Sequence, residues 1–480
     1  MPAIISRPFT KSFPQRLWLL LILLPVLVLT FYNWALADSF WFDEMFSATM
    51  AGDSFGSLWK EWFRYDTHPP LYTLILWVWV RVFGSSELAG RGLSMLFFLA
   101  ALLAFIRYTR KMPFYMVAVG LLISFPPITW YFAIEQRSYS LMLALSMIFF
   151  FRFRVVGRFD AVGAVLISLL SCTHFFGTIA TCCFLLVWFM MLLKERRYGD
   201  LPGFLLAAFL ALLPAVCFYC WQFFSGNMLN LTGGKFWIQT TTVNALRIYK
   251  GVLLPFAWSY IPLAAVAILI IALSIQWKKA FAGWIKEPFA LTLLLAFVLT
   301  MLVNAFNPLI VARYLLVFLP LVGLAIMPWI KDPLLWFPGK SVGGMLGLIL
   351  LVGVWQYYTW DTLHQKHQDA AAYNSQADYL QQAGLPVYSV TAPVADMFTR
   401  QMNESVANYY RRLHHPSQPS YMLLDTTKLG QLHKPFAIQL VQTQTRRRPD
   451  IMKALENYAV KKVEMLGREG WDAVLIVDDK

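Results

Sequence analysis

The chain has 480 residues, of which 59% are hydrophobic and 14% charged, with a mean hydropathy of +0.56. This composition excludes an ordinary soluble domain and is typical of a membrane protein with many spans. The formal net charge is +14, but residues 1–360 hold 26 Lys and Arg against 13 Asp and Glu, whereas residues 361–480 hold 14 against 13. The positive excess therefore lies in the apolar part, where basic loops set membrane orientation, and nucleic acid is not an expected partner.

The first apolar run, "LWLLLILLPVLVLTFYNWALA", follows a basic segment and has about the twenty residues needed to cross the hydrocarbon core. The competing interpretation is a cleaved signal peptide, because "ALA" before Asp38 resembles a cleavage site. We favour an uncleaved helix, since the run is longer than a usual signal core and many further runs follow.

Basic clusters flank alternate connections between the apolar runs, which predicts that those connections are cytoplasmic and that the N-terminus is too. The runs fall at residues 17–36, 70–84, 89–106, 113–131, 138–151, 160–175, 176–193, 203–224, 251–275, 288–306, 312–330 and 342–360. The run at 70–84 would be only about 22 Å long as a helix, against a core of about 30 Å. We expect that it does not cross fully, which leaves about eleven crossings and keeps the alternation of basic loops.

The first outer loop, residues 37–69, holds six of the 13 acids found in residues 1–360. A solvated polar loop explains most of them, with Asp53 and Ser54 capping a following helix. Asp43 and Glu44 differ because aromatic and apolar residues surround them in "FWFDEMF". A carboxylate beside apolar material suits a general base, so both are candidate catalytic residues.

The loop closes with "YDTHPPLY", in which Pro69 and Pro70 fix the backbone where Asp66 and His68 enter the membrane boundary. His68 on its own is most simply a polar residue at a helix start. Asp66 at the same boundary is a candidate for a substrate pocket.

Two further segments carry Arg close to Tyr at the outer membrane boundary, on the predicted side of the first outer loop. "WYFAIEQRSYS" contains Glu135, Arg137 and Tyr139, and "NPLIVARYLLVFLP" contains Arg313 and Tyr314. A single arginine there can serve as a lipid-headgroup anchor. Two such pairs beside an acidic loop favour an anionic ligand, because guanidinium binds phosphate in a specific geometry.

His174, in "SCTHFFG", is the lone histidine within the apolar part. Such a residue is often structural, but a polar side chain at membrane depth is also a candidate for the substrate pocket. Six of the apolar runs contain no Asp, Glu, Lys, Arg or His. A coupled transporter needs ionisable residues near the midplane, so this pattern disfavours one.

Helix and strand signals alternate after residue 360, ending with the strand-like "AVLIV". The sequence thus predicts a helical membrane module at 1–360 and a small α/β domain on the outer face at 361–480.

The chain also carries a series of motifs in a specific order. They are Asp43-Glu44 after the first span, then "DTHPPLY", "FGSSELAGRGLS", "EQRSY", "THFFG" and "ARYLLVFLP". This order resembles the GT-C fold glycosyltransferases, most closely the bacterial branch related to protein O-mannosyltransferases and the lipid A aminoarabinose transferase. The resemblance covers residues 17 to about 330.

The resemblance implies transfer of a sugar from a polyprenyl-phosphate-linked donor to a lipid, glycan or protein acceptor on the outer face of the inner (plasma) membrane. It implies that Asp43 is the base, with Glu44 beside it. Arg137, Tyr139, Arg313, Tyr314 and His68 are the donor-phosphate candidates. The aminoarabinose transferases tend to have Lys at the position of His68.

No required cofactor is expected. Asp43, Glu44 and His68 could bind a divalent metal, but their spacing does not demand one. Two alternatives stay open, namely a flippase or transporter that binds the carrier phosphate through the same arginines, and an O-antigen ligase or polymerase. Neither the sugar nor the acceptor can be read from the sequence.

Overall fold

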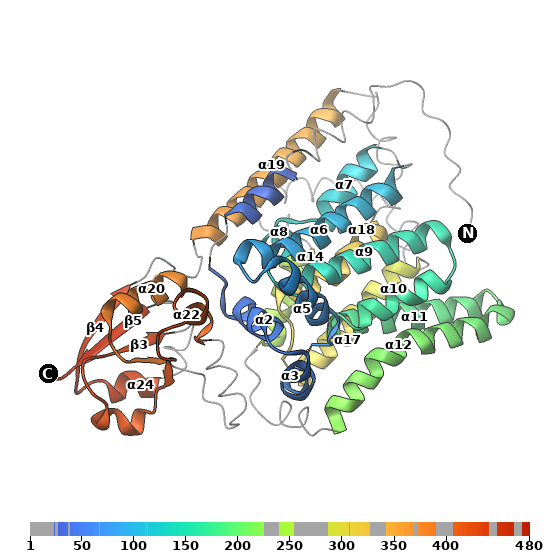
Figure 1. Ribbon diagram of the computed structural model, residues 1–480. Helices are drawn as coiled ribbons and strands as arrows, with labels where there is room; N and C mark the ends of the chain where they lie inside the picture. Colours follow the sequence, from blue (N-terminus) through green and yellow to red (C-terminus); the bar gives the residue numbers. More distant parts are fainter. Residues whose placement is uncertain are drawn as a thin grey trace. The chain divides into compact units, whose positions relative to one another are not determined.

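A computed structural model describes two compact units of the chain, each considered by itself (Figure 1). It describes residues 24, 27–36, 39–66, 68–110, 112, 114–224, 240–253, 287–306, 308–326, 342–368, 373–389, 407–440, 449–464 and 473–480. Outside these ranges lie residues 254–275 of the apolar run at 251–275, residues 17–23, 25 and 26 of the run at 17–36, and the basic residues at 278–286 and 331–340. The helical unit comprises residues 1–34, 54–78 and 91–362, and the sheet unit comprises residues 35–53, 79–90 and 363–480.

Five helices in the described part of the chain are long and apolar enough to cross a membrane. They are α6 (Glu87–Thr109), α9 (Tyr139–Val156), α11 (Phe175–Lys194), α12 (Leu201–Phe224) with the short 3-10 turn before it, and α17 (Pro288–Phe306). These helices confirm the prediction of a multi-pass α-helical membrane protein. The total number of crossings stays a prediction.

Several predicted runs are shorter or interrupted in the structure. Helix α5 (Leu71–Phe83) has 13 residues and so extends only about 20 Å. The run at 113–131 is divided into α7 (Phe114–Ser124) and α8 (Pro127–Ala133), because Pro127 has no N–H for a continuous helix. The run at 312–330 begins as the 3-10 helix η4 (Ala312–Phe318) and continues as α18 (Leu319–Ile326).

The remaining elements of the helical unit are short or peripheral. They are α3 (Phe55–Ser57), the π-helical turn η1 (Leu58–Trp62), α4 (Phe63–Tyr65), α10 (Ala161–Ser171), the 3-10 turn η2 (Tyr198–Asp200), α14 (Thr242–Leu253) and most of α19 (Val342–Gln368). The last of these passes through residue 360 as one continuous helix.

The core of the helical unit is aromatic and tightly packed. Helix α10 packs against α9, α11 and α12, and α11 packs against α17 (Figure 1). The Phe153 ring centroid lies 4.8 Å from that of Phe184 and 4.7 Å from that of Trp188, in edge-on contacts. A Cβ atom on Gly177 would lie 2.4 Å from the Leu170 carbonyl oxygen, so the close approach of α10 and α11 requires glycine there.

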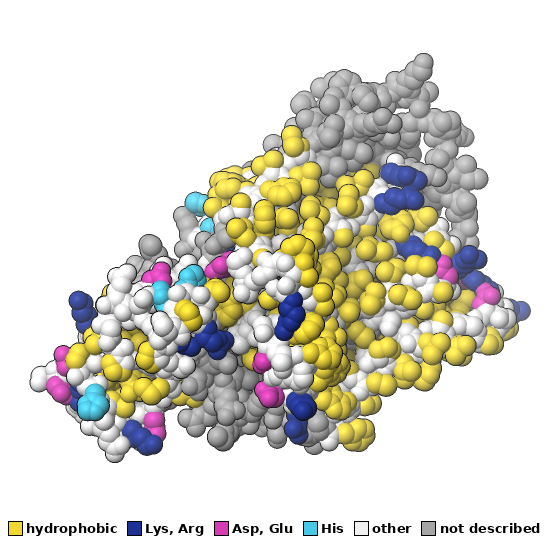
Figure 2. Space-filling model, viewed as in Figure 1, with side chains coloured by type: hydrophobic (Ala, Val, Ile, Leu, Met, Phe, Trp, Pro, Cys, Tyr) yellow, Lys and Arg dark blue, Asp and Glu magenta, His cyan; other side chains and the backbone are white. Residues whose placement is uncertain are grey.

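On the face shown in Figure 2, the described surface of the helical unit is largely apolar. On α12, for example, Leu206 and Phe209 are 60% and 61% exposed. Lys and Arg gather at the helix ends where α9 meets α10 and α11 meets α12 (Figure 2). An apolar belt with charged ends is the surface expected of a bundle solvated by lipid.

The turn between α9 and α10 is closed by a bidentate ion pair. Arg152 donates to both carboxylate oxygens of Asp160, at 2.9 and 2.6 Å. The same carboxylate accepts the Gly163 N–H at 2.9 Å and so caps α10. The hydrogen bond from Arg152 lowers the pKa of Asp160 to about 2.

The sheet unit contains a mixed five-stranded sheet with the strand order β2-β1-β3-β5-β4. Strand β1 (Val387–Ser389) is parallel to β2 (Met422–Leu423) and β3 (Phe436–Leu440). Strand β5 (Ala473–Asp478) is antiparallel to β3 and to β4 (Ala459–Glu464). A small C-terminal sheet was predicted, whereas its position on the outer face stays a prediction.

Helices complete the sheet unit. They are α2 (Phe42–Gly52), α20 (Tyr373–Ala383), α22 (Tyr409–His414), the 3-10 helix η7 (Thr426–Gln431) and α24 (Pro449–Ala454). Helix α2 and the residues just before it come from the first loop, yet they pack with C-terminal residues. Phe40, Met45 and Ala48 share one buried cluster with Tyr373, Ala377, Tyr409 and Tyr410.

Hydrogen bonds also connect the two ends of the sequence within the sheet unit. The Tyr410 hydroxyl accepts the Phe40 N–H at 2.5 Å and donates to Glu87 at 2.8 Å. Arg81 donates to the Ala51 and Asp53 carbonyls at the end of α2, at 2.9 and 2.6 Å. The helix that carries Asp43 and Glu44 is therefore anchored from both sides within this unit.

We predict that Asp160→Ala destabilises the protein by about 1 to 2 kcal/mol, because it removes both the cap of α10 and the ion pair with Arg152. Asp160→Asn keeps a capping oxygen and should fall between wild type and Asp160→Ala. Thermal unfolding of the purified protein in detergent measures the order of the three. Equal melting temperatures would show that this turn does not stabilise the bundle.

Candidate functional site

Most of the predicted site residues lie in the helical unit, on four segments. Asp66 and His68 end the first loop, Glu135, Arg137 and Tyr139 connect α8 to α9, His174 lies between α10 and α11, and Arg313 and Tyr314 begin η4. Asp43 and Glu44 lie in the sheet unit.

Four aromatic rings from these segments meet in what we call the His-Tyr ring cluster (His68, Tyr139, His174 and Tyr314). The His174 ring centroid lies 4.7 Å from His68, 4.5 Å from Tyr314 and 6.3 Å from Tyr139. The Tyr139 and Tyr314 centroids are 6.2 Å apart. Candidates that the sequence offered separately thus form one cluster.

The Arg313 guanidinium lies beside this cluster. Its central carbon is 5.8 Å from the Tyr139 ring centroid and 5.7 Å from that of Tyr314, within the range of cation–π attraction. Tyr139 and Tyr314 are themselves buried. The two tyrosines therefore hold the position of a cation in apolar surroundings.

The backbone that leads to Arg313 is fixed by an amide side chain. The Asn304 Oδ1 atom accepts the N–H groups of Leu309 and Ile310, at 2.9 and 3.0 Å. The Thr240 hydroxyl donates to the Ile310 carbonyl at 3.0 Å. These bonds satisfy an irregular segment between α17 and η4, as a buried backbone requires.

Arg137 and Glu135 occupy the buried connection between α8 and α9. Their side chains are 9% and 2% exposed. The Arg137 N–H donates to the Glu135 carbonyl at 2.6 Å, and the Ser94 hydroxyl donates to the same carbonyl at 2.6 Å. A second cation is thereby held within the helical unit.

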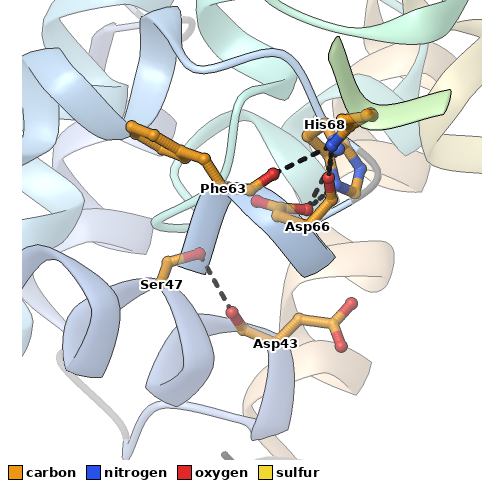
Figure 3. A network of polar contacts seen from close by, with 6 residues as sticks. Asp43, Ser47, Phe63, Asp66 and His68 are labelled. Carbon is orange, nitrogen blue, oxygen red and sulfur yellow. Dashed lines mark hydrogen bonds and ion pairs between the residues drawn. The ribbon is translucent and has the colours of Figure 1, made fainter. Parts of the chain in front are cut away.

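Asp66 and His68 form an ion pair at the end of the loop (Figure 3). The Asp66 Oδ1 atom lies 2.8 Å from His68 Nδ1 and accepts the His68 backbone N–H at 3.0 Å. Burial alone would raise the pKa of Asp66, but the charges and hydrogen bonds of His68, together with the charge of Arg137, bring it below its usual value of 3.8. The Asp66 carboxylate is therefore ionised at neutral pH.

Gln222 of α12 fastens the same loop, and sequence reasoning missed it. Its side-chain amide donates to the Phe63 carbonyl at 3.0 Å and also to the Asp66 carbonyl. The Leu71 N–H donates to the Cys172 carbonyl at 3.1 Å on the other side. The signal in the sequence is a lone amide within the apolar run at 203–224, which carries no charge to mark it as a site residue.

His174 is the N-cap of α11 and is 2% exposed. Its Nδ1 atom accepts the Phe176 N–H at 3.1 Å. Its Nε2 atom is buried and has no hydrogen-bond partner among the residues that the structure describes. His174 lies in the turn between two helices, where burial and the nearby charges of His68, Arg137 and Arg313 lower its pKa well below 6.5.

Glu44 and Asp43 differ sharply in their surroundings. Glu44 is fully buried, and its carboxylate accepts the Trp41 N–H at 3.4 Å at the start of α2. Asp43 is half-buried, and its backbone carbonyl accepts the Ser47 hydroxyl at 3.1 Å, while its carboxylate extends away from that bond (Figure 3). The carboxylate of Glu44 thus accepts a hydrogen bond from the N-cap residue of α2.

The expected cap at Asp53 and Ser54 is formed by Ser54. The Ser54 hydroxyl accepts the Ser57 N–H at 3.1 Å, whereas Asp53 follows the last residue of α2. In the described ranges, no group of three or more His, Cys, Asp or Glu is arranged to hold a metal. The expectation that no metal is required stays a prediction.

We predict that Asp66→Asn lowers thermal stability near neutral pH. The variant keeps an oxygen that accepts from His68, but it loses the charge that His68 and Arg137 stabilise. Because the pKa of Asp66 is lower in the folded state, its stabilisation is fully present above about pH 4 and is lost as the pH falls through the folded value. The melting temperatures of wild type and variant in detergent should therefore converge below about pH 4. A constant difference down to about pH 3 would contradict this assignment.

Comparison with known proteins supports the fold but gives no sequence relative: no protein-family model and no curated protein matches the chain. Two solved structures of ArnT from Cupriavidus metallidurans match it over 96% of this chain and 98% of theirs. The apo structure has 15% identity and a TM-score of 0.57, and the structure bound to undecaprenyl phosphate has 13% identity and a TM-score of 0.58. The chain therefore has the fold of ArnT, a lipid A aminoarabinose transferase of the GT-C class, as the motif order implied.

Proposed function

We propose that the chain is a membrane glycosyltransferase that moves a sugar from a polyprenyl-phosphate-linked donor to an acceptor hydroxyl. The main support is the position of Arg137 and Arg313 beside the buried His-Tyr ring cluster, which includes His68. It occurs in a fold shared with a protein whose structure contains undecaprenyl phosphate. The two guanidinium groups have the chemistry to bind the phosphate of the carrier.

The reaction transfers negative charge to the departing lipid phosphate. Arg137 and Arg313 would stabilise that charge as it develops, and no strong general acid is then required. The burial of Tyr139, His174 and Tyr314 lowers the local dielectric and strengthens this attraction. The aromatic surroundings and the two guanidinium groups are thus suited to the same step.

The acceptor hydroxyl must lose its proton as it attacks the sugar, so a base is needed. We assign this role to Asp43 rather than Glu44. Glu44 is fully buried and bonded to the start of its own helix, whereas Asp43 is partly accessible. One displacement by the acceptor would invert the configuration at the anomeric carbon.

The proposed location is the inner membrane, with the N-terminus cytoplasmic and the C-terminal domain on the outer face. The alternation of basic connections supports this orientation. The loop that carries Asp43 and the segments that carry Arg137 and Arg313 would then act on the same side, where lipid, glycan and protein acceptors are present.

We predict that Asp43→Asn reduces sugar transfer at least about 100-fold in membranes at unchanged expression, because the amide cannot accept the proton. Glu44→Gln is the matched control, since it keeps an oxygen for the Trp41 N–H and should retain most activity. Mass spectrometry of the acceptor measures transfer. Full activity of Asp43→Asn would remove the assignment of the base.

We predict that Arg313→Gln weakens the binding of undecaprenyl phosphate about 10-fold or more, because it removes a charge-assisted contact to phosphate. Binding of undecaprenol, which has no phosphate, should not change. Arg154→Gln is the control, since Arg154 pairs with Glu287 at 3.0 Å elsewhere in the helical unit. Equal losses for both variants would indicate a general effect of charge.

A deletion strain separates transfer from transport. A transferase predicts acceptors that lack one sugar, whereas a flippase predicts unchanged acceptor chemistry with carrier lipid retained on the inner leaflet. Comparative profiling of lipids and glycans with and without the protein would also identify the sugar and the acceptor.

A further inference from the structure

The N-cap position of α11 is occupied by His174, a residue type that is uncommon at this position. Ser, Thr, Asn and Asp are the common N-cap residues, because a short side chain can accept an N–H of the first turn. Here the imidazole of His174 has that function, with Nδ1 accepting the Phe176 N–H at 3.1 Å. The first helical hydrogen bond, from the Thr178 N–H to the His174 carbonyl, forms at 3.1 Å.

This cap determines which nitrogen of the ring carries the proton. A nitrogen that accepts a hydrogen bond has no hydrogen of its own, so the neutral ring must carry its hydrogen on Nε2. A doubly protonated ring would direct the Nδ1 hydrogen at the Phe176 N–H. The helix start therefore holds His174 as a neutral donor.

The other side of the ring is buried among cations and aromatic rings. The neighbouring groups are His68, Tyr139 and Tyr314, with the charges of Arg137 and Arg313 close by. Nε2 has no partner within the described ranges. A buried donor without an acceptor is costly, which indicates that a ligand supplies the acceptor.

We propose that His174 binds a phosphate oxygen of the polyprenyl carrier through its Nε2–H group, as a neutral donor and not as a base or a cation. The inference rests on the proposed function and adds the protonation state of one contact. Arg137 and Arg313 select an anion at this place. A neutral donor adds a hydrogen bond to that anion without adding a further buried positive charge, which would be unfavourable before the ligand binds.

Two substitutions separate the two functions of the ring. His174→Asn keeps an oxygen near the Nδ1 position and so keeps the cap, but it has no donor at the Nε2 position. His174→Gln can place its amide nitrogen near the Nε2 position but loses the cap. The binding of undecaprenyl phosphate and of undecaprenol is measured for wild type and both variants at a temperature where each is folded.

We expect His174→Asn to keep the wild-type melting temperature and to bind undecaprenyl phosphate about 10-fold more weakly. We expect His174→Gln to melt at a lower temperature and to bind within a few-fold of wild type. If His174 were only a cap, the asparagine variant would bind like wild type, and this result would overturn the proposal. If the glutamine variant fails to fold, the binding of undecaprenyl phosphate by the asparagine variant is sufficient to test the proposal.

The pH dependence gives a second test. Because the donor is neutral throughout, the ratio of the wild-type and His174→Asn dissociation constants should be constant between about pH 6 and about pH 8. If the wild-type dissociation constant fell relative to that of His174→Asn as the pH falls, a charged imidazole would bind the phosphate, and the proposal would be wrong. If wild type binds undecaprenyl phosphate no better than undecaprenol, the proposed function fails together with this inference.

Discussion

The ion pair between Asp66 and His68 is the contact on which the candidate site depends. It fixes the last turn of the first loop just before α5, and Gln222 and the Cys172 carbonyl hold the backbone on both sides. This pair holds the His68 ring in its position against His174 and Tyr314. Because the carboxylate is buried, it needs a partner, and that need places the imidazole.

The helical unit combines regular spans with irregular backbone at the site. The connection between α8 and α9, the turn before α11 and the 3-10 helix η4 each carry one or two of the candidate residues. Exposed to lipid, such segments would be unstable, since their polar backbone groups would lack partners. Side chains such as Asn304 supply those partners, which allows irregular segments and a 3-10 helix, instead of α-helices, to hold the two arginines.

Much of this could be predicted from the sequence, because charged residues stand out against an apolar background. Arg137, Arg313, His68 and His174 were identifiable for that reason, and the order of their motifs indicated the fold. Gln222 was missed because its function depends on carbonyls distant in the sequence. The grouping of α2 with the C-terminal residues could not be foreseen either, since nothing in the spacing of Tyr409 and Tyr410 points to Phe40.

That grouping changes what counts as a module in this chain. A cut after the last long helix would appear to separate a membrane-spanning part from an accessory domain. It would instead divide a hydrophobic core, leaving Phe40, Met45 and Ala48 without Tyr373 and the two adjacent tyrosines of α22. Any exchange of C-terminal domains between proteins of this architecture would have to include the α2 segment, because the two segments complete one hydrophobic core.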